Sequence, residues 1–435
     1  MERKTLENNE KSRDHAVLVG LRSPVLAEDS ADEESLMELS ELVETAGGDT
    51  AGIILQSREK PDPHSFIGEG KVEEVKRMVD NEQATMVIFD NELSPSQIRV
   101  LTELLGVQVI DRSGLILDIF AQRARTKEGC LQVELAQYQY LLPRLIGMWS
   151  HLERQGGTGG SPIGTKGPGE TQLETDRRHI HRKIDKLKEE LEEVRRVRNT
   201  QRQRRMKNEI PVVAIVGYTN AGKSTLLNAI TGAGIPANNR LFDTLDTTTR
   251  LLTVSDTLDV VISDTVGFIR KLPHQLVEAF KATLEELEYA DLLLHVIDLS
   301  NPQWAQQAQV VDDLIRELKA DHIPCLRVYN KCDLAFSGAL PREKDSVYIS
   351  AKTGEGIKRL LQAVDEKLDK GTRRVTIHLP YDKAGLLDGL YREAKVENVE
   401  YGETVDITAV CTPRIMGQLK DYIEGWQEEK EDWEQ

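Results

Sequence analysis

The first third of the chain alternates short, β-branched apolar runs with amphipathic stretches. The runs HAVLVG, AGIILQ, TMVIFD and VQVID stand between helix-type patterns such as KVEEVKRMVDN and SPSQIRVLTELLG. Alternation of this kind is typical of a parallel sheet with covering helices. A longer helical stretch, from SGLILDIF to YLLPRL, completes a predicted α/β domain over residues 1–150. The turn Gly68–Lys71 lacks phosphate-loop spacing, so it predicts a helix start, with a ligand role as the alternative.

Residues 151–208 combine a glycine-rich run with a long polar helix pattern. The glycines between Gly156 and Gly169 leave too little side chain to pack. From Glu174 to Lys207 there is no proline, apolar residues recur at heptad-like spacing, and basic residues dominate both ends. This pattern predicts one or two long helices from Glu174 to Lys207. We interpret residues 151–208 as a glycine-rich loop followed by a basic helical hairpin. A merely solvated hairpin is the alternative for such a charge run.

The strand and helix alternation resumes at Pro211. Apolar runs PVVAIVG, DVVISDT, DLLLHVID, PCLRVYN and SVYIS are each followed by a helix-type pattern, which predicts a second α/β domain over residues 209–371. The remainder, residues 372–435, mixes strand runs such as RRVTIHLP with helical ones and predicts a small α+β domain. Nowhere does an uncharged apolar run reach the roughly 20 residues that would span a bilayer.

The overall charge limits the partners. The 435-residue chain carries a formal net charge of −17, so general adhesion to nucleic acid or anionic membranes is excluded unless positive charge is gathered locally.

The four cysteines are far apart and form no C-x-x-C pair, which suits reduced thiols and excludes a disulfide scaffold. These features favour a cytoplasmic protein.

A phosphate-binding motif opens the second α/β domain. The stretch GYTNAGKST follows the apolar strand PVVAIV and opens a helix, matching G-x-x-x-x-G-K-S. In this pattern backbone amides close around the phosphates, Lys223 supplies a positive charge and Ser224 offers its hydroxyl to Mg²⁺. The predicted phosphate-binding residues are Gly217, Tyr218, Thr219, Asn220, Ala221, Gly222, Lys223, Ser224 and Thr225.

Three later motifs, each at the end of an apolar strand, identify the nucleotide. DTVG offers Asp264 to the magnesium shell and the amide of Gly267 to the γ-phosphate. NKCD offers the carboxylate of Asp333 to two donors of guanine that adenine lacks, and the SAK stretch places an amide on the guanine oxygen. Together with the phosphate-binding motif, these three motifs stand at strand ends in the order typical of a GTPase domain, so we predict a GTPase. The predicted contacts are Asp264, Thr265, Val266, Gly267, Asn330, Lys331, Asp333, Ser350, Ala351 and Lys352.

The first switch is placed in LFDTLDTTTR, where several threonines compete for the magnesium shell. We favour Thr244, which follows an aromatic residue; a threonine cluster that only caps a loop is the alternative. Mg²⁺ is thus expected on Ser224, Thr244 and Asp264, with Lys223, Thr244 and Gly267 in the hydrolytic roles. The nucleotide contacts predicted in the switch are Phe242, Asp243, Thr244, Leu245 and Asp246.

The usual water-orienting glutamine is absent. The residue after Gly267 is Phe268, whose ring cannot polarise water, so slow intrinsic hydrolysis and an external activator are expected. Asn220 resembles the asparagine that related GTPases use to hold K⁺, with a loop-stabilising amide as the alternative. His274 is a second local candidate, although a lone histidine at a helix start is more often a cap.

Taken together, these motifs resemble the HflX family of ribosome-associated GTPases over nearly the whole chain. The most specific marks are GPGETQLETDRR, FIGEGKVEEV, FDNELSPSQIRVL and DTVGFIRKLPHQLVEAFKATLEE. The resemblance implies an N-terminal α/β domain with a long helical hairpin, a central P-loop GTPase domain and a small C-terminal domain. It also implies binding to the large ribosomal subunit and splitting of stalled or idle ribosomes under stress. Lys166 and Thr247 depart from the family pattern, in which arginine and proline are usual.

The hairpin is therefore interpreted as an RNA-binding arm of a monomer that binds GTP and GDP. A glycine-rich tip can enter a narrow ribosomal cleft, and basic helix ends can meet rRNA phosphates. The rival reading is a protein-signalling GTPase whose hairpin binds a partner helix. The predicted RNA contacts are Gly164, Lys166, Gly167, Gly169, Arg177, Arg178 and Arg182.

Overall fold

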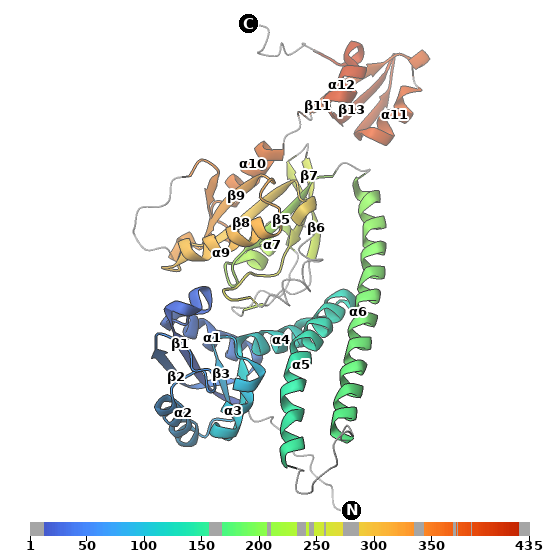
Figure 1. The fold of residues 1–435 in the computed structure, drawn as a ribbon. Coiled ribbons are helices and arrows are strands. Elements are labelled where there is room, and N and C mark those ends of the chain that lie inside the picture. Colours follow the sequence, from blue (N-terminus) through green and yellow to red (C-terminus); the bar gives the residue numbers. More distant parts are fainter. Residues whose placement is uncertain are drawn as a thin grey trace, which may run out of the picture.

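The computed structural model places three sheet-containing units in a row, with a two-helix arm beside them (Figure 1). The units are an N-terminal parallel-sheet domain, a central α/β domain that carries the predicted GTPase motifs and is called the GTPase domain below, and a C-terminal domain with an antiparallel sheet. This is the α/β architecture that the sequence predicted. The structure describes residues 13–155, 168–206, 210–232, 241–242, 248–255, 258–272, 287–334, 343–368, 371, 373–383 and 385–425.

The N-terminal domain is a four-stranded parallel sheet of order β2-β1-β3-β4, covered by helices on both faces. Val17 and Val19 pack under α2 and α3, while Ala16 and Leu18 pack under α1 and α4. Burial of both faces explains why the strands are continuously apolar. The strands are β1 (His15–Arg22), β2 (Asp49–Ser57), β3 (Met86–Phe89) and β4 (Gln108–Asp111). The helices are α1 (Glu33–Ala46), α2 (Glu69–Glu82), α3 (Pro95–Leu105) and α4 (Arg112–Arg123).

Local capping explains where these helices begin. Ser94 and Gln97 form a capping box with Pro95 in the first turn of α3, so the predicted helix starts where its sequence signals lie. Gly68 is the N-cap of α2, which confirms that the glycine–lysine turn begins a helix.

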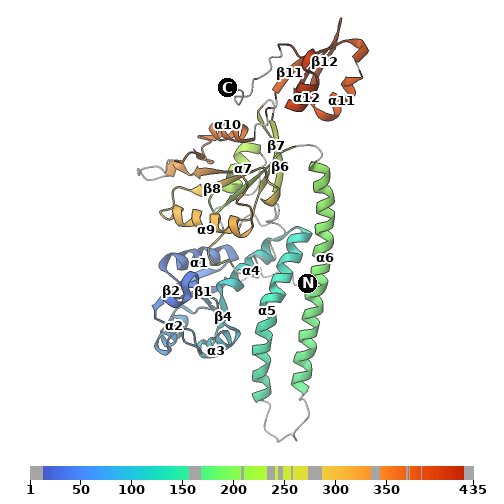
Figure 2. The same ribbon diagram turned by 45° about the horizontal axis from the view of Figure 1, so that its top comes forward.

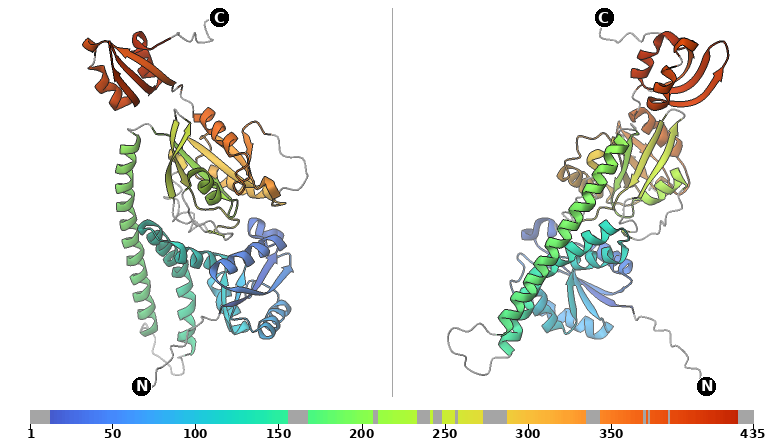
Figure 3. Two further views of the ribbon diagram at one scale, coloured as in Figure 1. Left: turned by 180° about the vertical axis from the view of Figure 1, so that it is seen from behind. Right: turned by 90° about the vertical axis from the view of Figure 1, so that its right-hand side faces the viewer.

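The arm is an antiparallel pair of long helices, α5 (Lys127–Gln155) and α6 (Pro168–Met206). Leu131 and Leu135 of α5 pack against Ile184, Leu187 and Leu191 of α6. The partner of α6 is thus α5, a helix that the sequence analysis counted with the first domain because it follows α4 without a clear break. Figures 2 and 3 show the arm running past the N-terminal domain, with its far end away from the GTPase domain.

A buried carboxylate fixes the root of the arm. Asp111, at the end of β4, is fully buried and accepts hydrogen bonds from the backbone amide of Gly114 at 2.9 Å and from the hydroxyl of Tyr140 at 2.7 Å. The guanidinium of Arg144 donates to its other oxygen at 2.8 Å and lies 3.3 Å from the centre of the Tyr140 ring. One side chain therefore joins the sheet, α4 and α5.

The GTPase domain has a six-stranded sheet of order β10-β9-β8-β5-β7-β6. Its strands are parallel except β6, which pairs antiparallel with β7. The sequence analysis did not predict β6, because its threonine-rich start was read as part of the first switch. The strands are β5 (Val212–Gly217), β6 (Thr248–Ser255), β7 (Leu258–Asp264), β8 (Leu292–Asp298), β9 (Cys325–Asn330) and β10 (Ser346–Tyr348). The α-helices among the described residues of this domain are α7 (Lys223–Thr231), α9 (Trp304–Glu317) and α10 (Ile357–Leu368).

The C-terminal domain is a three-stranded antiparallel sheet of order β11-β13-β12. Alternate residues of β13, such as Ile407 and Ala409, are buried against α11 and α12. The elements are β11 (Arg373–Leu379), α11 (Leu386–Glu393), β12 (Lys395–Tyr401), β13 (Val405–Cys411) and α12 (Pro413–Gln418). Within the described part of the chain, every helix is too short or too polar to cross a membrane.

We predict that Tyr140→Phe loosens the arm at its root. The substitution removes one hydrogen bond to a buried carboxylate, a loss of about 1.5–3 kcal/mol. Amide hydrogen exchange in α5 should therefore accelerate in the variant. Tyr391→Phe, an exposed tyrosine of α11, is the control and should change nothing. Equal exchange in α5 of the Tyr140 variant and the wild type would show that the hydroxyl does not hold the arm.

Candidate functional site

The predicted phosphate loop lies where β5 ends and α7 begins. Gly217 and Gly222 both adopt positive φ angles, 155° and 93°, which β-carbon-bearing residues rarely tolerate. A β-carbon on Gly222 would also lie 2.3 Å from the side-chain nitrogen of Asn330. The glycines of the motif are therefore required by the backbone path, which leaves the amides before α7 facing the phosphate position.

Lys223, the first residue of α7, is buried inside the loop. Its ammonium group donates to the backbone oxygens of Gly217 at 3.1 Å and Tyr218 at 2.8 Å. Burial lowers the pKa of Lys223 to about 8, and the nearby carboxylate of Asp264 opposes that shift. The lysine is held as a cation by backbone oxygens that phosphate oxygens can replace.

The magnesium ligands predicted from separate motifs lie together. The hydroxyl of Ser224 donates to a carboxylate oxygen of Asp264 at 2.8 Å, and Asp264 is fully buried at the end of β7. A hydroxyl and a carboxylate in contact form an oxygen donor set that suits Mg²⁺. The third predicted ligand, Thr244, lies outside the described residues, as do Asp243, Leu245, Asp246 and His274.

Gly267 closes the phosphate side of the site. A β-carbon there would come within 2.9 Å of both the Lys223 ammonium and the Thr219 methyl group. Only glycine allows this approach, so its backbone amide is available beside the phosphate loop. Thr265 has a different role, since its hydroxyl donates to the backbone oxygen of Ile215 at 2.7 Å and holds β7 to β5.

Asn330 connects the guanine motifs to the phosphate loop. Its side-chain nitrogen donates to the oxygen of Ala221 at 2.8 Å, and its side-chain oxygen accepts from the amide of Ala351 at 2.9 Å. Lys331 donates to Asp298 at 2.7 Å, while Asp333, in the turn after β9, is exposed. Ser350 is buried. Of the remaining predicted contacts, Thr225 lies in the first turn of α7, Val266 follows β7, and the exposed Lys352 lies in the turn after β10.

Phe268 acts through its backbone. The backbone amide of Thr219 donates a hydrogen bond to the backbone oxygen of Phe268 at 2.7 Å. The backbone amide of Phe268 donates to the backbone oxygen of Gly217 at 3.1 Å. Its ring is buried in an apolar cluster that also contains Phe242 and residues of α1 and α4. The segment after β7 is thus fastened to the phosphate loop, and the ring points into the core between two domains.

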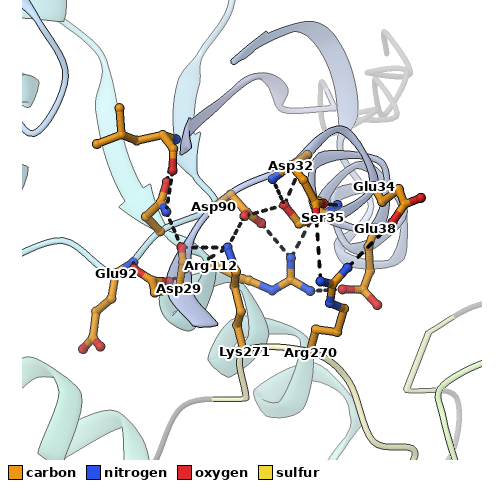
Figure 4. Close-up of polar contacts among 12 residues, drawn as sticks. Asp29, Asp32, Glu34, Ser35, Glu38, Asp90, Glu92, Arg112, Arg270 and Lys271 are labelled. Atoms are coloured by element: carbon orange, nitrogen blue, oxygen red, sulfur yellow. Dashed lines mark hydrogen bonds and ion pairs between the residues drawn. The ribbon is translucent and has the colours of Figure 1, made fainter. Parts of the chain in front are cut away.

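A buried charge network joins this segment to the N-terminal domain (Figure 4). Arg112, only 2% exposed, pairs with Asp90 at 2.7 Å and with Glu38. Lys271 reaches across from the GTPase domain to Asp90 at 2.5 Å. Burial acts to raise the pKa of Asp90, but Arg112 and Lys271 outweigh it and hold that pKa below its usual range.

Tyr218 of the phosphate loop takes part in the same junction. Its hydroxyl donates to Glu38 and accepts a hydrogen bond from the backbone amide of Arg270 at 2.9 Å. Burial and the Glu38 carboxylate raise the pKa of Tyr218, so the hydroxyl stays protonated. Sequence reasoning counted Tyr218 as a nucleotide contact and missed its side-chain role, and it missed Arg112 and Lys271 altogether. No short-range spacing connects these residues.

The predicted RNA contacts are only partly described. Arg177, Arg178 and Arg182 are exposed on α6, near its start at Pro168, and Gly169 lies in the first turn of that helix. Gly164, Lys166 and Gly167 lie outside the described residues.

Comparison with known proteins finds matches along most of the chain. The matching family models are GTP-binding GTPase N-terminal (residues 33–121), GTP-binding GTPase Middle Region (123–205), 50S ribosome-binding GTPase (212–331) and HflX C-terminal domain (339–433). The GTPase HflX of Caldanaerobacter subterraneus subsp. tengcongensis is 48% identical over 419 residues, which cover 96% of each chain. The GTPase HflX of Escherichia coli K12 is 47% identical over 84% of this chain and 86% of its own. A GDP-bound GTP-binding protein from Sulfolobus solfataricus shares 25% identity over 81% of this chain and 98% of its own, with a TM-score of 0.44.

Nucleotide affinity should fall with rising pH above about pH 8. In the free protein Lys223 loses its proton near that pH, whereas bound phosphates favour the charged form, so binding takes up a proton. GDP affinity should be flat from pH 7 to 8 and then weaken by up to about tenfold per pH unit. Calorimetry in buffers of different ionisation enthalpy would detect the proton uptake. In Lys223→Met the affinity should be weaker throughout and lack this slope; a slope of the same size in the variant would assign it to another group.

Lys271→Met should weaken docking of the N-terminal domain on the GTPase domain. Without Lys271, one buried arginine faces two carboxylates, and breaking a buried pair in this way costs about 3–5 kcal/mol. Hydrogen exchange should accelerate in residues 86–93. Arg270→Ala is the control because its ion pairs, at 3.6 and 3.9 Å, are more exposed and should contribute under about 1 kcal/mol. Equal effects of the two variants would contradict the assignment.

Proposed function

Because this chain belongs to the HflX family of GTPases and hydrolyses GTP, we propose that it is a factor of the large ribosomal subunit. In this proposal the GTP-bound protein binds the subunit, ribosomal contact stimulates hydrolysis, and the cycle splits stalled or idle ribosomes under stress. The description of the matched central domain as a 50S ribosome-binding GTPase supports this partner.

The observation that carries the proposal is that the arm keeps its apolar contacts between its own two helices and exposes arginines to solvent. Most apolar side chains in the described part of the arm face inward, where Leu131 and Leu135 meet α6, and the exposed Leu141 and Val197 stand singly on different helices. The arginines near the start of α6 face outward and are exposed. An arm that bound a partner helix would need an outward apolar seam, whereas exposed arginines suit the phosphates of rRNA. The arm therefore favours RNA over the rival protein-signalling function.

The dimensions of the arm fit the same role. Helix α6 has 39 residues, which at 1.5 Å per residue is about 58 Å long. Its basic start lies at the end remote from the GTPase domain (Figure 1). In a protein of net charge −17 this local positive charge directs one end of the molecule toward RNA. We extend the contact surface to Gly164, Lys166, Gly167 and Gly169.

For the nucleotide site we propose the roles predicted from the motifs. Lys223 and the amides of the phosphate loop hold the phosphates, the amide of Gly267 meets the γ-phosphate, and Asp333 with the amide of Ala351 selects guanine. Ser224 and Asp264, with Thr244, would hold Mg²⁺, which when bound neutralises phosphate charge. Potassium held by Asn220 is one candidate for the positive charge beside the phosphates. Asn220 has a left-handed φ of 61° and lines a cavity next to the loop.

The switch segments connect the nucleotide to the rest of the molecule. The segment after β7 is bonded both to the phosphate loop, through Phe268, and to the N-terminal domain, through Lys271. A γ-phosphate that draws in the Gly267 amide therefore acts on a segment shared by two domains. We propose that the GTP form, as a cytoplasmic monomer, presents the arm to the ribosome and that hydrolysis releases it.

The proposal predicts that the protein sediments with large ribosomal subunits in a non-hydrolysable GTP analogue and less so in GDP. Substituting Arg177, Arg178 and Arg182 by alanine should weaken this binding and make its salt dependence shallower by about 2–3 in the slope of log affinity against log salt. Addition of large subunits should accelerate phosphate release many-fold in the wild type and much less in the variant.

The matched control removes three exposed basic residues from elsewhere in the N-terminal domain, by alanine substitution of Lys60, Lys76 and Arg77. It should keep the wild-type salt slope. Binding of the wild type that is insensitive to salt would instead support a protein partner for the arm. Wild-type hydrolysis that is unchanged by large subunits would overturn the proposed activation.

A further inference from the structure

A cavity of about 750 Å³ separates the phosphate loop from the N-terminal domain. Asn220 and Leu241 line it from the GTPase domain. The opposite wall includes the end of α1 and the end of α4, with Arg123 and Arg125. The phosphate loop therefore faces a space whose far side belongs to another domain and carries arginines.

The hydrolytic site needs a group that the GTPase domain does not provide at the usual position. The ring of Phe268 is buried between the domains and its backbone is bonded to the phosphate loop. It can neither orient water nor offset the charge that develops on the phosphoryl oxygens. In GTPases an arginine supplied within the same chain or by a partner can meet that need.

Helix α4 is fastened to the segment that leads into the first switch. The ring of Phe120 packs edge-on against that of Phe242, with centroids 4.6 Å apart and an interplanar angle of 85°. Arg123 follows Phe120 by three residues in the same helix, so both lie on one face. This contact places the half-buried Arg123 on the wall of the cavity that Leu241 and Asn220 line from the GTPase domain.

The other arginines of the cavity are less suited to the role. The side chain of Arg13 is 72% exposed and precedes β1, far along the cavity wall from the ring contact of Phe120 with Phe242. Arg125 lies beyond the end of α4 and is exposed. Glu41 and Glu44 also line the cavity, so it is not uniformly basic. Any attraction for a phosphate must come from one positioned cation and not from the average charge.

We propose that Arg123 of the N-terminal domain is the arginine that completes the hydrolytic site, by contacting the γ-phosphate of GTP across this cavity. Water forms a new bond to the γ-phosphorus as the bond to the β–γ bridging oxygen breaks. That electron pair stays on GDP. One proton of the water stays on the attacking oxygen and the other passes to the released phosphate, which leaves as dihydrogen phosphate. Arg123 offsets negative charge on the transferring group. The inference rests on the GTPase activity and is independent of the ribosomal partner.

The test compares Arg123→Ala with Arg125→Ala, which removes the same charge from the same cavity. With the protein in saturating excess over GTP, single-turnover hydrolysis should slow by about 100-fold or more in the Arg123 variant and by less than about threefold in the Arg125 variant. GDP affinity and the thermal unfolding midpoint should stay close to wild type in both. The wild type should form a stable complex with GDP and aluminium fluoride, a mimic of the transferring group, and the Arg123 variant should not.

Arg123→Gln decides the question if the alanine variant fails to fold, because glutamine keeps much of the stem and removes the charge. A rate within threefold of wild type in either Arg123 variant would overturn the proposal. Equal losses in the Arg123 and Arg125 variants would do the same, since they indicate general electrostatics. So would a rate loss matched by an equal loss of GDP affinity, which indicates a structural role. Finally, hydrolysis that requires K⁺ over Na⁺ yet ignores Arg123 would assign the cation to Asn220.

Discussion

The salt bridges of Arg112 are the interaction on which the arrangement of this molecule depends. A guanidinium that is almost fully buried survives only if carboxylates surround it, and here Asp90 and Glu38 do so. Those two acids and one arginine leave a net negative charge, which Lys271 of the GTPase domain neutralises. The buried charges of Asp90, Glu38 and Arg112 in the N-terminal domain are thus balanced only when the GTPase domain is docked on it.

The residue before Arg112 performs the corresponding task for the arm. Asp111 accepts hydrogen bonds from Tyr140 and Arg144 of α5, so two consecutive residues at the start of α4 hold two different parts of the molecule. Asp111 orients the arm and Arg112 orients the acids that meet the GTPase domain. Because Asp111 and Arg112 both stand at the start of α4, the arm and the GTPase domain are attached to the N-terminal domain at the same place.

Sequence reasoning found the elements whose signals are local. The parallel strands have continuous apolar runs, and the phosphate loop, DTVG and NKCD motifs have fixed spacing, so the α/β domains and the cluster around Lys223 and Asp264 were accessible. The strand β6 was missed because the threonines at its start were interpreted as part of the first switch. The network of Arg112 and Lys271 was inaccessible for another reason, since it joins residues far apart in the chain whose individual motifs suggest nothing about each other.

The length of α6 has a mechanical consequence. This helix packs along α5, which is bonded to Asp111 at its root, so a tilt of the arm is carried along a stiff rod. Over about 58 Å, a tilt of one degree moves the remote end by roughly 1 Å. A displacement too small to disturb packing around a nucleotide therefore becomes, at the other end of the lever, comparable to the spacing between neighbouring atoms in an RNA groove.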